Sequence, residues 1–190
     1  MIEVRNISKS YGDVTVFDNW SHDFPTGAVT CVMGASGLGK TTLLRLIMGL
    51  EQPDKGMIAL PEDTRFACVF QEDRLISHLS ALKNLRLVQS KRDDGEIKKL
   101  LTELGLEGSV TKPVRELSGG MARRVSIARC LIHPANTLLM DEPLKGLDVN
   151  TRLLTAEVIK KRAQGKTLLL VTHDREDAAF FGGETVEITR

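Results

Sequence analysis

The chain has 190 residues with 26 basic and 25 acidic side chains, so its net charge is +1, and only 4% of its residues are aromatic. A near-neutral, aromatic-poor chain gives no case for binding nucleic acid or an anionic membrane surface, and no apolar run approaches the ~20 residues that span a bilayer. Because the N-terminus also lacks signal-peptide regions and the three cysteines lack metal-ligand spacing, we expect one cytosolic domain with reduced thiols.

The first thirty residues are expected to form antiparallel strands. Residues 2–30 contain alternating segments around Tyr11-Gly12-Asp13, a pattern typical of a hairpin. Further along, short apolar runs rich in β-branched residues or leucine occupy residues 29–33, 66–70, 137–140 and 167–171. Because these runs are continuously apolar, they predict strands of a parallel sheet that is covered on both faces.

Each of these predicted strands ends in a polar or glycine-rich element. The first run leads into a loop that starts at Gly34. The other three lead to Gln71, to Asp141-Glu142 and, after Thr172, to His173. Since ligands of open α/β sheets bind beyond the carboxyl ends of the strands, we expect these ends to converge on one site.

The loop after the first run matches the phosphate-binding pattern GxxxxGK[ST], the Walker A motif or P-loop, and precedes a helix expected from Thr42 to Met48. Glycines let the backbone wrap a β-phosphate with N–H donors, Lys40 adds a positive charge, and the Thr41 hydroxyl binds Mg²⁺. The predicted nucleotide-binding residues here are Gly34, Ala35, Ser36, Gly37, Leu38, Gly39, Lys40, Thr41 and Thr42.

Between residues 72 and 134 the pattern becomes helical. Leucines at helical spacing predict one helix near 79–85, and an i, i+3, i+4, i+7 stripe predicts another that starts at Asp93 or Asp94 and stops at Gly105. We interpret this block as a helical insertion in a nucleotide-binding core. A last helix is expected at about 149–164 and a terminal strand at 184–188.

A second glycine turn, Leu117-Ser118-Gly119-Gly120-Met121, opens another helix of this block. Ser118 is a natural N-cap, and apolar residues recur at helical spacing from Met121 to Ile132. Because a helix N-terminus carries partial positive charge and unpaired N–H donors, the turn is a second candidate site for phosphate. If the turn is considered alone, an ordinary glycine turn that enters an amphipathic helix is the simpler interpretation.

The carboxylates of Asp141 and Glu142 follow a buried strand. We expect Asp141 to hold Mg²⁺ directly or through water. Glu142 precedes Pro143, which favours an extended backbone, and its carboxylate could polarise a water that attacks a γ-phosphate. The alternative is a solvated acidic pair at a strand end.

The remaining two strand ends leave more than one interpretation open. The amide of Gln71 could coordinate Mg²⁺ or orient water, but many strands end in a polar residue. A lone histidine is usually structural or solvated. Only its place at a strand end favours His173 as a contact to a γ-phosphate.

Taken in order, these motifs resemble the ATP-binding cassette (ABC) ATPase family over essentially the whole chain. The matching segments are GASGLGKTT (34–42), FQ (70–71), LSGGM (117–121), LLMDEP (138–143), GLD (146–148) and TH (172–173). The resemblance implies an α/β fold: a P-loop NTPase core with a parallel sheet, an N-terminal antiparallel β subdomain and an inserted α-helical subdomain. It also implies a single ABC ATPase domain over residues 1–190, with the core at about 1–71 and 135–190 and the helical subdomain at about 72–134.

The same resemblance implies the site residues and cofactors. The catalytic residues would be Lys40, Gln71, the general base Glu142 and the switch histidine His173, with Tyr11 stacked on the adenine of ATP. Mg²⁺ would be held by Thr41, Gln71 and Asp141. The partner subunit of a homodimer, or of a pair of sister cassettes, would supply Ser118, Gly119, Gly120, Met121 and, at the junction, Asp148.

By this resemblance the chain hydrolyses ATP for a separate integral membrane permease, at the cytoplasmic face of the membrane. The stretch from Val69 to Leu85 is similar to that of bacterial importer subunits, which would also use a substrate-binding protein. One alternative is an ABC ATPase that does mechanical work in repair or translation, but the chain has neither the long heptad insertion nor the second cassette of those types. Another is a nucleotide-gated module that does not hydrolyse ATP, against which Glu142 argues.

Two positions depart from the family pattern. Met121 stands where glutamine is usual, and Lys145 stands where a small polar residue is more common. We therefore expect γ-phosphate recognition to be kept and the coupling between the two sites to be altered. Because the last predicted strand is followed closely by Arg190, we also expect no C-terminal regulatory domain of the kind seen in some importers.

Overall fold

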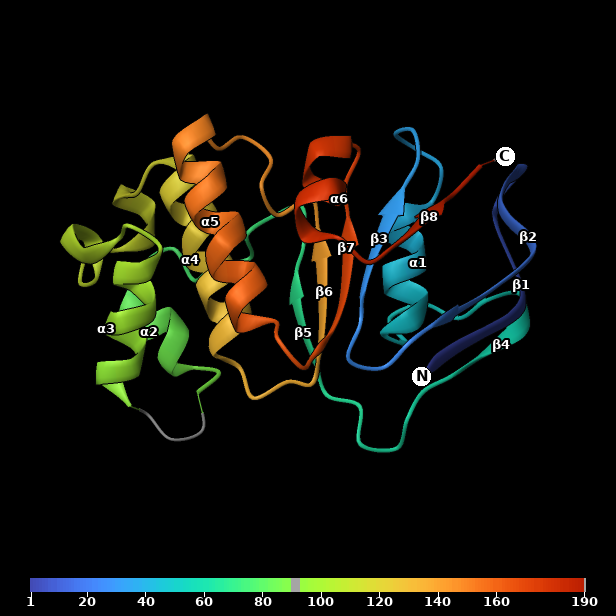
Figure 1. Cartoon of the computed structure of the whole chain (residues 1–190), viewed down its shortest axis with the longest axis horizontal. Coiled ribbons are helices and arrows are strands. Elements are labelled where there is room, and N and C mark those ends of the chain that lie inside the picture. Colours follow the sequence, from blue (N-terminus) through green and yellow to red (C-terminus); the bar gives the residue numbers. More distant parts are fainter. Residues whose placement is uncertain (90–92, 190) are drawn as a thin grey trace.

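A five-stranded parallel sheet lies at the centre of the computed structural model, which describes residues 1–89 and 93–189 (Figure 1). Its strands lie in the order β5-β6-β7-β3-β8. Their bounds are Val29–Met33 for β3, Phe66–Val69 for β5, Thr137–Asp141 for β6, Thr167–Val171 for β7 and Glu184–Glu187 for β8. All the pairings are parallel, so each predicted apolar run and the predicted terminal strand are confirmed as strands.

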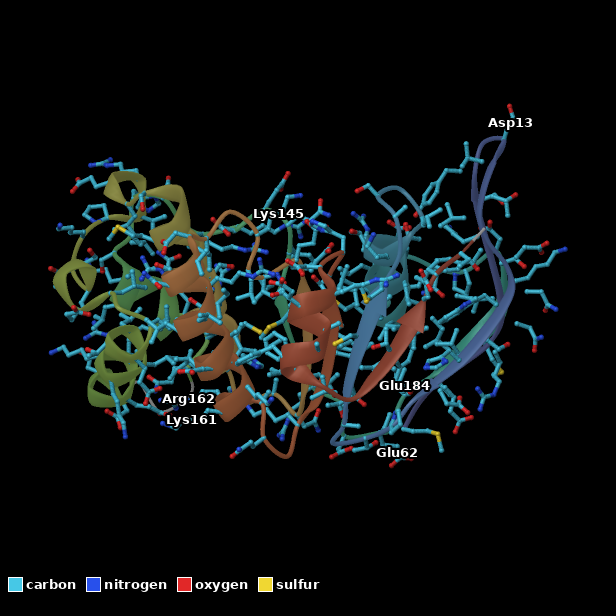
Figure 2. The ribbon with its side chains drawn as sticks, turned by 45° about the horizontal axis from the view of Figure 1, so that its top comes forward. Asp13, Glu62, Lys145, Lys161, Arg162 and Glu184 are labelled. Carbon is cyan, nitrogen blue, oxygen red and sulfur yellow. The ribbon has the colours of Figure 1, made fainter. Side chains whose placement is uncertain are left out.

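An antiparallel sheet of order β2-β1-β4 carries the N-terminal part of the chain. It consists of β1 Ile2–Tyr11, β2 Val14–Phe24 and β4 Lys55–Ala59. The first two strands confirm the predicted hairpin, whose tip is at Asp13 (Figure 2). The sequence did not predict β4, because this edge strand is mostly exposed and contains Gly56, so it has neither an alternating nor a continuous apolar pattern.

Helices flank the parallel sheet. Their bounds are Lys40–Ile47 for α1, Ala81–Arg86 for α2, Asp94–Glu103 for α3, Gly119–Ile132 for α4, Val149–Arg162 for α5 and Arg175–Phe181 for α6, with short 3₁₀ turns at Glu107–Ser109 and Val114–Glu116. Figure 1 shows α2, α3 and α4 on the side of the parallel sheet that faces away from the antiparallel sheet. The predicted helix 42–48 begins earlier, at Lys40, directly after the left-handed Gly39. The seven-residue α6 was not predicted, because it is too short to show a periodic pattern.

The parallel strands are apolar throughout because they separate two apolar cores. In β6, Leu138 and Met140 belong to the larger core, together with residues of α2 to α5. Leu139, between them, belongs to the smaller core, together with residues of α1, β1 and β2. Successive side chains of a strand face opposite sides of a sheet, so both sets of positions in β6 must be apolar.

The structure also bears on membrane-spanning segments and on the cysteines. Within residues 1–89 and 93–189, no helix is long and apolar enough to cross a bilayer. The three cysteines are free thiols, with Cys31 and Cys130 buried and Cys68 half-buried. Burial raises the pKa of both Cys31 and Cys68 to about 11, which keeps these thiols protonated at neutral pH.

Candidate functional site

The phosphate-binding loop connects β3 to α1 and is closed by its own lysine. Lys40 is 7% exposed, and its ammonium group donates hydrogen bonds to the carbonyls of Gly34 at 2.7 Å and Ala35 at 2.8 Å. Gly39 has φ +95°, and a Cβ atom there would lie 2.2 Å from Cγ1 of Val16. Only glycine therefore fits at this point of the loop.

An open cavity lies over this loop at the carboxyl ends of the parallel strands. Its lining residues are Tyr11, Val16, Ser36, Gly37, Gly39, Lys40, Thr41, Thr42, Gln71, Glu142 and Lys145. The structure thus brings most of the predicted nucleotide-binding residues to one cavity. Leu38 packs instead against the smaller core, so it can contribute to the loop only through its backbone.

Thr41 and Asp141 meet at the floor of this region. The Thr41 hydroxyl donates to Oδ2 of Asp141 at 2.5 Å. The Asp141 side chain is buried, and its other oxygen, Oδ1, has no hydrogen-bond partner among the described residues. Burial raises the pKa of the Asp141 carboxyl, although the hydrogen bond from Thr41 acts in the opposite direction. A buried, half-satisfied carboxylate beside a threonine hydroxyl is a suitable donor set for a divalent cation.

Glu142 occupies the turn after β6 with its carboxylate held from two sides. Oε1 lies 2.9 Å from Nδ1 of His173, and Oε2 lies 2.8 Å from Nζ of Lys145. Burial raises the pKa of the Glu142 carboxyl, but the interactions with Lys145 and His173 outweigh it, so the pKa lies below its usual value. The carboxylate is therefore ionised at neutral pH and able to accept a proton.

The expected extended backbone at Glu142 is wrong. The residue has φ +47°, a left-handed conformation that costs a non-glycine residue about 1–3 kcal/mol. The preference imposed by Pro143 is overridden by tertiary hydrogen bonds. The Glu142 N–H donates to the carbonyl of Val171 at 2.9 Å, and its carbonyl accepts from Arg123 at 2.8 Å.

Gln71, His173 and Tyr11 also line the cavities at this edge of the parallel sheet. Gln71 is exposed and lines the cavity over the phosphate loop. The imidazole of His173 is 58% exposed and lines a neighbouring cleft with Glu142 and Lys145. Tyr11 is 47% exposed in the first cavity, where its hydroxyl donates to a carboxylate oxygen of Glu51.

The second glycine turn lies apart from the phosphate loop. Ser118 caps α4, since its Oγ accepts from the Met121 N–H at 3.3 Å. Gly119 and Gly120 line a separate cavity with Gln71 and Glu142, and no residue of 117–121 is among the described residues that line the cavity over Lys40. Asp148 caps the start of α5, where its carboxylate accepts from the Thr151 N–H at 3.1 Å.

Arg123 is a residue of the site that the sequence did not reveal. Its side chain is 6% exposed, and its guanidinium group donates to the backbone carbonyls of the turn that carries Glu142. In sequence it is one of two adjacent arginines in a helix with apolar residues on several sides, so no periodic signal distinguishes it from Arg124. Lys145 was singled out as a departure from the family pattern, but its contact with Glu142 was not predicted.

The sequence is similar to those of known proteins over nearly the whole chain. The family model described as ABC transporter matches residues 17–145 of the chain. The spermidine/putrescine import ATP-binding protein PotA of Spiroplasma citri is 40% identical over 197 residues, which cover 94% of this chain and 56% of that protein. The Fe(3+) ions import ATP-binding protein FbpC of Escherichia coli O157:H7 is 38% identical over 194 residues, covering 93% and 56%. The chain therefore spans about half the length of the curated relatives that it matches.

Two solved structures have the same fold. A dimeric structure of MJ0796, a bacterial ABC transporter cassette, has a TM-score of 0.87 and 29% sequence identity, with 99% of this chain and 94% of that chain covered. A dimeric post-hydrolysis state of the same cassette, bound to ADP and Pi, has a TM-score of 0.87 and 28% identity, with 100% and 94% covered. The likeness extends over nearly the whole of both chains.

Proposed function

The chain belongs to the ABC transporter family, and from this premise we propose that it is an ATP-binding and ATP-hydrolysing subunit of an ABC transporter. The observation that carries the proposal is the place of Glu142. Its ionised carboxylate lies at the edge of the cavity that holds Lys40 and Thr41, on a strained turn that the surrounding structure maintains. Strain of this kind clusters at functional sites.

We propose that ATP binds over the loop 34–42. Its phosphates would meet the backbone N–H groups of the loop and the start of α1, and Lys40 would exchange its two carbonyl partners for the phosphates. Tyr11 lines the same cavity, where its exposed ring can stack on the adenine. The core at about 1–71 and 135–190 would thus bind the nucleotide, and the helical subdomain at about 72–134 would carry the second glycine turn.

Mg²⁺ fits the oxygen donors at this site. Mg²⁺ prefers hard oxygen ligands. The candidates here are Oδ1 of Asp141, which has no hydrogen-bond partner among the described residues, the hydroxyl of Thr41 and the amide oxygen of Gln71. When bound with ATP, Mg²⁺ neutralises charge on the β- and γ-phosphates. Asp141 would hold the ion directly or through water.

Hydrolysis would use Glu142 as the general base. The carboxylate takes a proton from a water molecule as the water oxygen attacks the γ-phosphorus and the bond to the β,γ-bridging oxygen breaks, giving ADP and phosphate. His173, 2.9 Å from Glu142, holds the carboxylate in place and can contact the γ-phosphate. Lys40 would stabilise the charge that develops on the transferred group.

A second copy of the chain, or a sister cassette, would complete the site. Ser118, Gly119, Gly120 and Met121 lie away from the chain's own phosphate loop, so we propose that they contact the γ-phosphate bound by the partner, with Asp148 at the junction. A helix N-terminus contributes about 0.3–2 kcal/mol toward an anion. Two such contacts per dimer would let ATP stabilise the closed pair and let hydrolysis release it.

We further propose that the dimer drives import through a separate integral membrane permease. The curated relatives are named as import ATP-binding proteins for polyamines or for Fe(3+). Because their cargoes differ while their cassettes match, cargo choice would lie in the permease and in a substrate-binding protein. The subunit would then lie at the cytoplasmic face of the membrane. Mechanical work in repair or translation is the alternative, and none of these relatives favours it.

The catalytic part of the proposal is tested with Glu142→Gln. We expect single-turnover ATP hydrolysis to fall about 10²–10⁴-fold while ATP binding is kept, and an ATP-dependent dimer to accumulate in size-exclusion chromatography. Glu103→Gln is the matched control. Glu103 pairs with Arg162 at 2.8 Å, and Figure 2 shows Arg162 at the lower edge of the molecule, away from Lys145 at the upper edge. Equal hydrolysis rates for Glu142→Gln and the wild type would disprove the role of Glu142.

The transport part needs a separate experiment. The Glu142→Gln protein would be trapped with ATP in native membranes, and the proteins that co-purify would be identified. An integral membrane protein is the expected partner. Recovery of ribosomes or DNA instead would favour the alternative of mechanical work.

A further inference from the structure

The guanidinium group of Arg123 joins three segments that lie far apart in the chain. Its Nη2 donates to the carbonyls of Asp141 and Glu142, both at 2.8 Å, and its Nε donates to the carbonyl of Pro143 at 3.0 Å. Its Nη1 donates to the carbonyl of Phe70 at 2.5 Å. Arg123 itself belongs to α4, whose first turn contains Gly119 and Gly120.

These contacts use every N–H of the side chain. A guanidinium group has five donors in a rigid planar fork, and the fifth donor reaches Oδ1 of Asp73 at 3.1 Å. The side chain is 6% exposed, so its charge is compensated by this carboxylate and by the carbonyl dipoles around it. A lysine ammonium, which has three donors at a single point, cannot hold the same set of acceptors.

The held carbonyls belong to the segments that position the reacting groups. The carbonyl of Glu142 lies in the left-handed turn that aims the general base, and the carbonyl of Phe70 directly precedes Gln71. The helix that carries Arg123 begins at the glycine turn that would contact the partner's nucleotide. A rigid link among these three segments means that a shift of α4 must also move the turn of Glu142.

We propose that Arg123 is a positioning residue that links the phosphate-binding turn at the start of α4 to the turn of Glu142 and the loop of Gln71. This inference rests on the proposed function of Glu142 as the general base. Through this link, closure of α4 over the partner's nucleotide places Glu142 for hydrolysis in its own subunit. Arg123 would act through the carbonyls that it holds, because protein acceptors engage all five of its N–H donors.

The first test compares Arg123→Lys with Arg129→Lys. Arg129 lies on the same helix and donates to the carbonyls of Asp73 and Arg74. Within residues 1–89 and 93–189, it donates no hydrogen bond to residues 141–143. We expect Arg123→Lys to lower kcat by up to about 100-fold, which is the cost of misplacing a reacting group by about 1 Å, while the KM for ATP stays within about twofold. Arg129→Lys should retain turnover within about threefold. An equal loss in both variants would overturn the proposal, because the contacts with 141–143 would then not matter.

The second test is a double-mutant cycle with Glu142→Gln, measured as single-turnover hydrolysis per bound ATP. If Arg123 acts by positioning the carboxylate, Arg123→Lys should cause little further loss once Glu142 is replaced. A merely structural role would lower the rate by the same factor in both backgrounds, and that result would overturn the proposal. A different result would disprove the proposed function itself: a single-turnover rate of Glu142→Gln equal to that of the wild type.

If Arg123→Lys does not fold, the same double-mutant cycle can be measured with Asp73→Asn. The Asp73 carboxylate is 27% exposed, and its replacement leaves every carbonyl acceptor of Arg123 in place. We expect a smaller fall in kcat, again absent in the Glu142→Gln background. A fall of equal size in both backgrounds would count against the link.

Discussion

Lys145 forms an ion pair with Glu142 across the turn that follows β6, with Nζ 2.8 Å from Oε2. The lysine side chain is 66% exposed, whereas the carboxylate is 8% exposed. Figure 2 shows Lys145 at the upper edge of the molecule, between the helices on the left and the parallel sheet. The ion pair therefore bears directly on the carboxylate that we propose as the general base.

Replacing Lys145 should change the pH dependence of hydrolysis. Lys145 and His173 together hold the pKa of Glu142 below its usual value against the effect of burial. Lys145→Ala removes one of the two, so the pKa of Glu142 should rise. The base must be deprotonated to act, so the acid limb of the kcat/KM profile for ATP should move to higher pH. Lys145→Arg keeps the positive charge and should leave the limb in place. An acid limb that does not move in Lys145→Ala would show that this ion pair does not act on the catalytic group.

Asp141→Asn should separate folding stability from metal dependence. The wild-type protein buries a carboxylate whose Oδ1 has no partner among the described residues, whereas an amide is neutral and can still accept from Thr41. We expect the free energy of unfolding of the nucleotide-free variant at pH 7 to exceed that of the wild type by about 1 kcal/mol. A ligand present at 100 times its Kd stabilises the folded protein by about 2.7 kcal/mol. ATP should stabilise the wild-type protein more strongly when Mg²⁺ is present, whereas Mg²⁺ should make no such difference for Asp141→Asn.

The difference in the free energy of unfolding between Asp141→Asn and the wild type should depend on pH in one direction. Burial raises the pKa of Asp141 in the folded state, so the carboxyl favours folding below the unfolded pKa of about 3.9 and loses this contribution as the pH rises through the folded value. The advantage of Asp141→Asn should therefore be largest at neutral pH and shrink on acidification. Calorimetry with and without Mg-ATP would measure both effects. If the stability advantage of Asp141→Asn grows on acidification, the pKa of Asp141 is not raised in the folded state.

The elements that the sequence predicted are those whose signal is local. Continuous apolarity in residues 137–140 reports two buried faces, and the loop at Gly34–Thr41 is defined by glycines that the backbone requires. The terminal strand and the long helices were likewise found from periodicity and caps. β4 was missed because it is an exposed edge strand that depends on pairing with β1.

The contacts of the site could not be predicted in the same way, because they join distant segments. Arg123 meets carbonyls about twenty and fifty positions away in sequence, and a carbonyl has no sequence signature. The turn at Glu142 is left-handed because Val171 and Arg123 hold it, whereas the local influence of Pro143 favours an extended chain. Sequence patterns thus predicted which residues gather at the sheet edge, and tertiary hydrogen bonds decide how they are aimed.

Asp148 has a structural role that must be separated from any role at a subunit junction. Its side chain caps α5 by accepting from the Thr151 N–H. Asp148→Ala should lower the unfolding midpoint by about 2–4 °C, as expected for the loss of an N-cap in a chain of this size. Asp148→Asn keeps a good cap, so its midpoint should be unchanged. If Asp148→Asn nevertheless alters turnover at constant stability, the carboxylate acts at the subunit junction. If its turnover equals that of the wild type, Asp148 serves only as the N-cap of α5.

Met121 tests whether the second glycine turn belongs to the partner's site. It is half-buried against the larger core, and it does not line the cavity over Lys40 among the described residues. Met121→Gln introduces the amide that the family resemblance implies at this position, at a stability cost of about 1 kcal/mol or less. ATP affinity of the dilute monomer should stay within about twofold of wild type, whereas turnover at protein concentrations that permit dimers should change. Met121→Leu keeps the apolar contact without an amide and should match the wild type in both measurements. A change in monomer affinity for Met121→Gln would mean that the turn acts on its own subunit's nucleotide, and the arrangement in which two chains share each ATP would have to be abandoned.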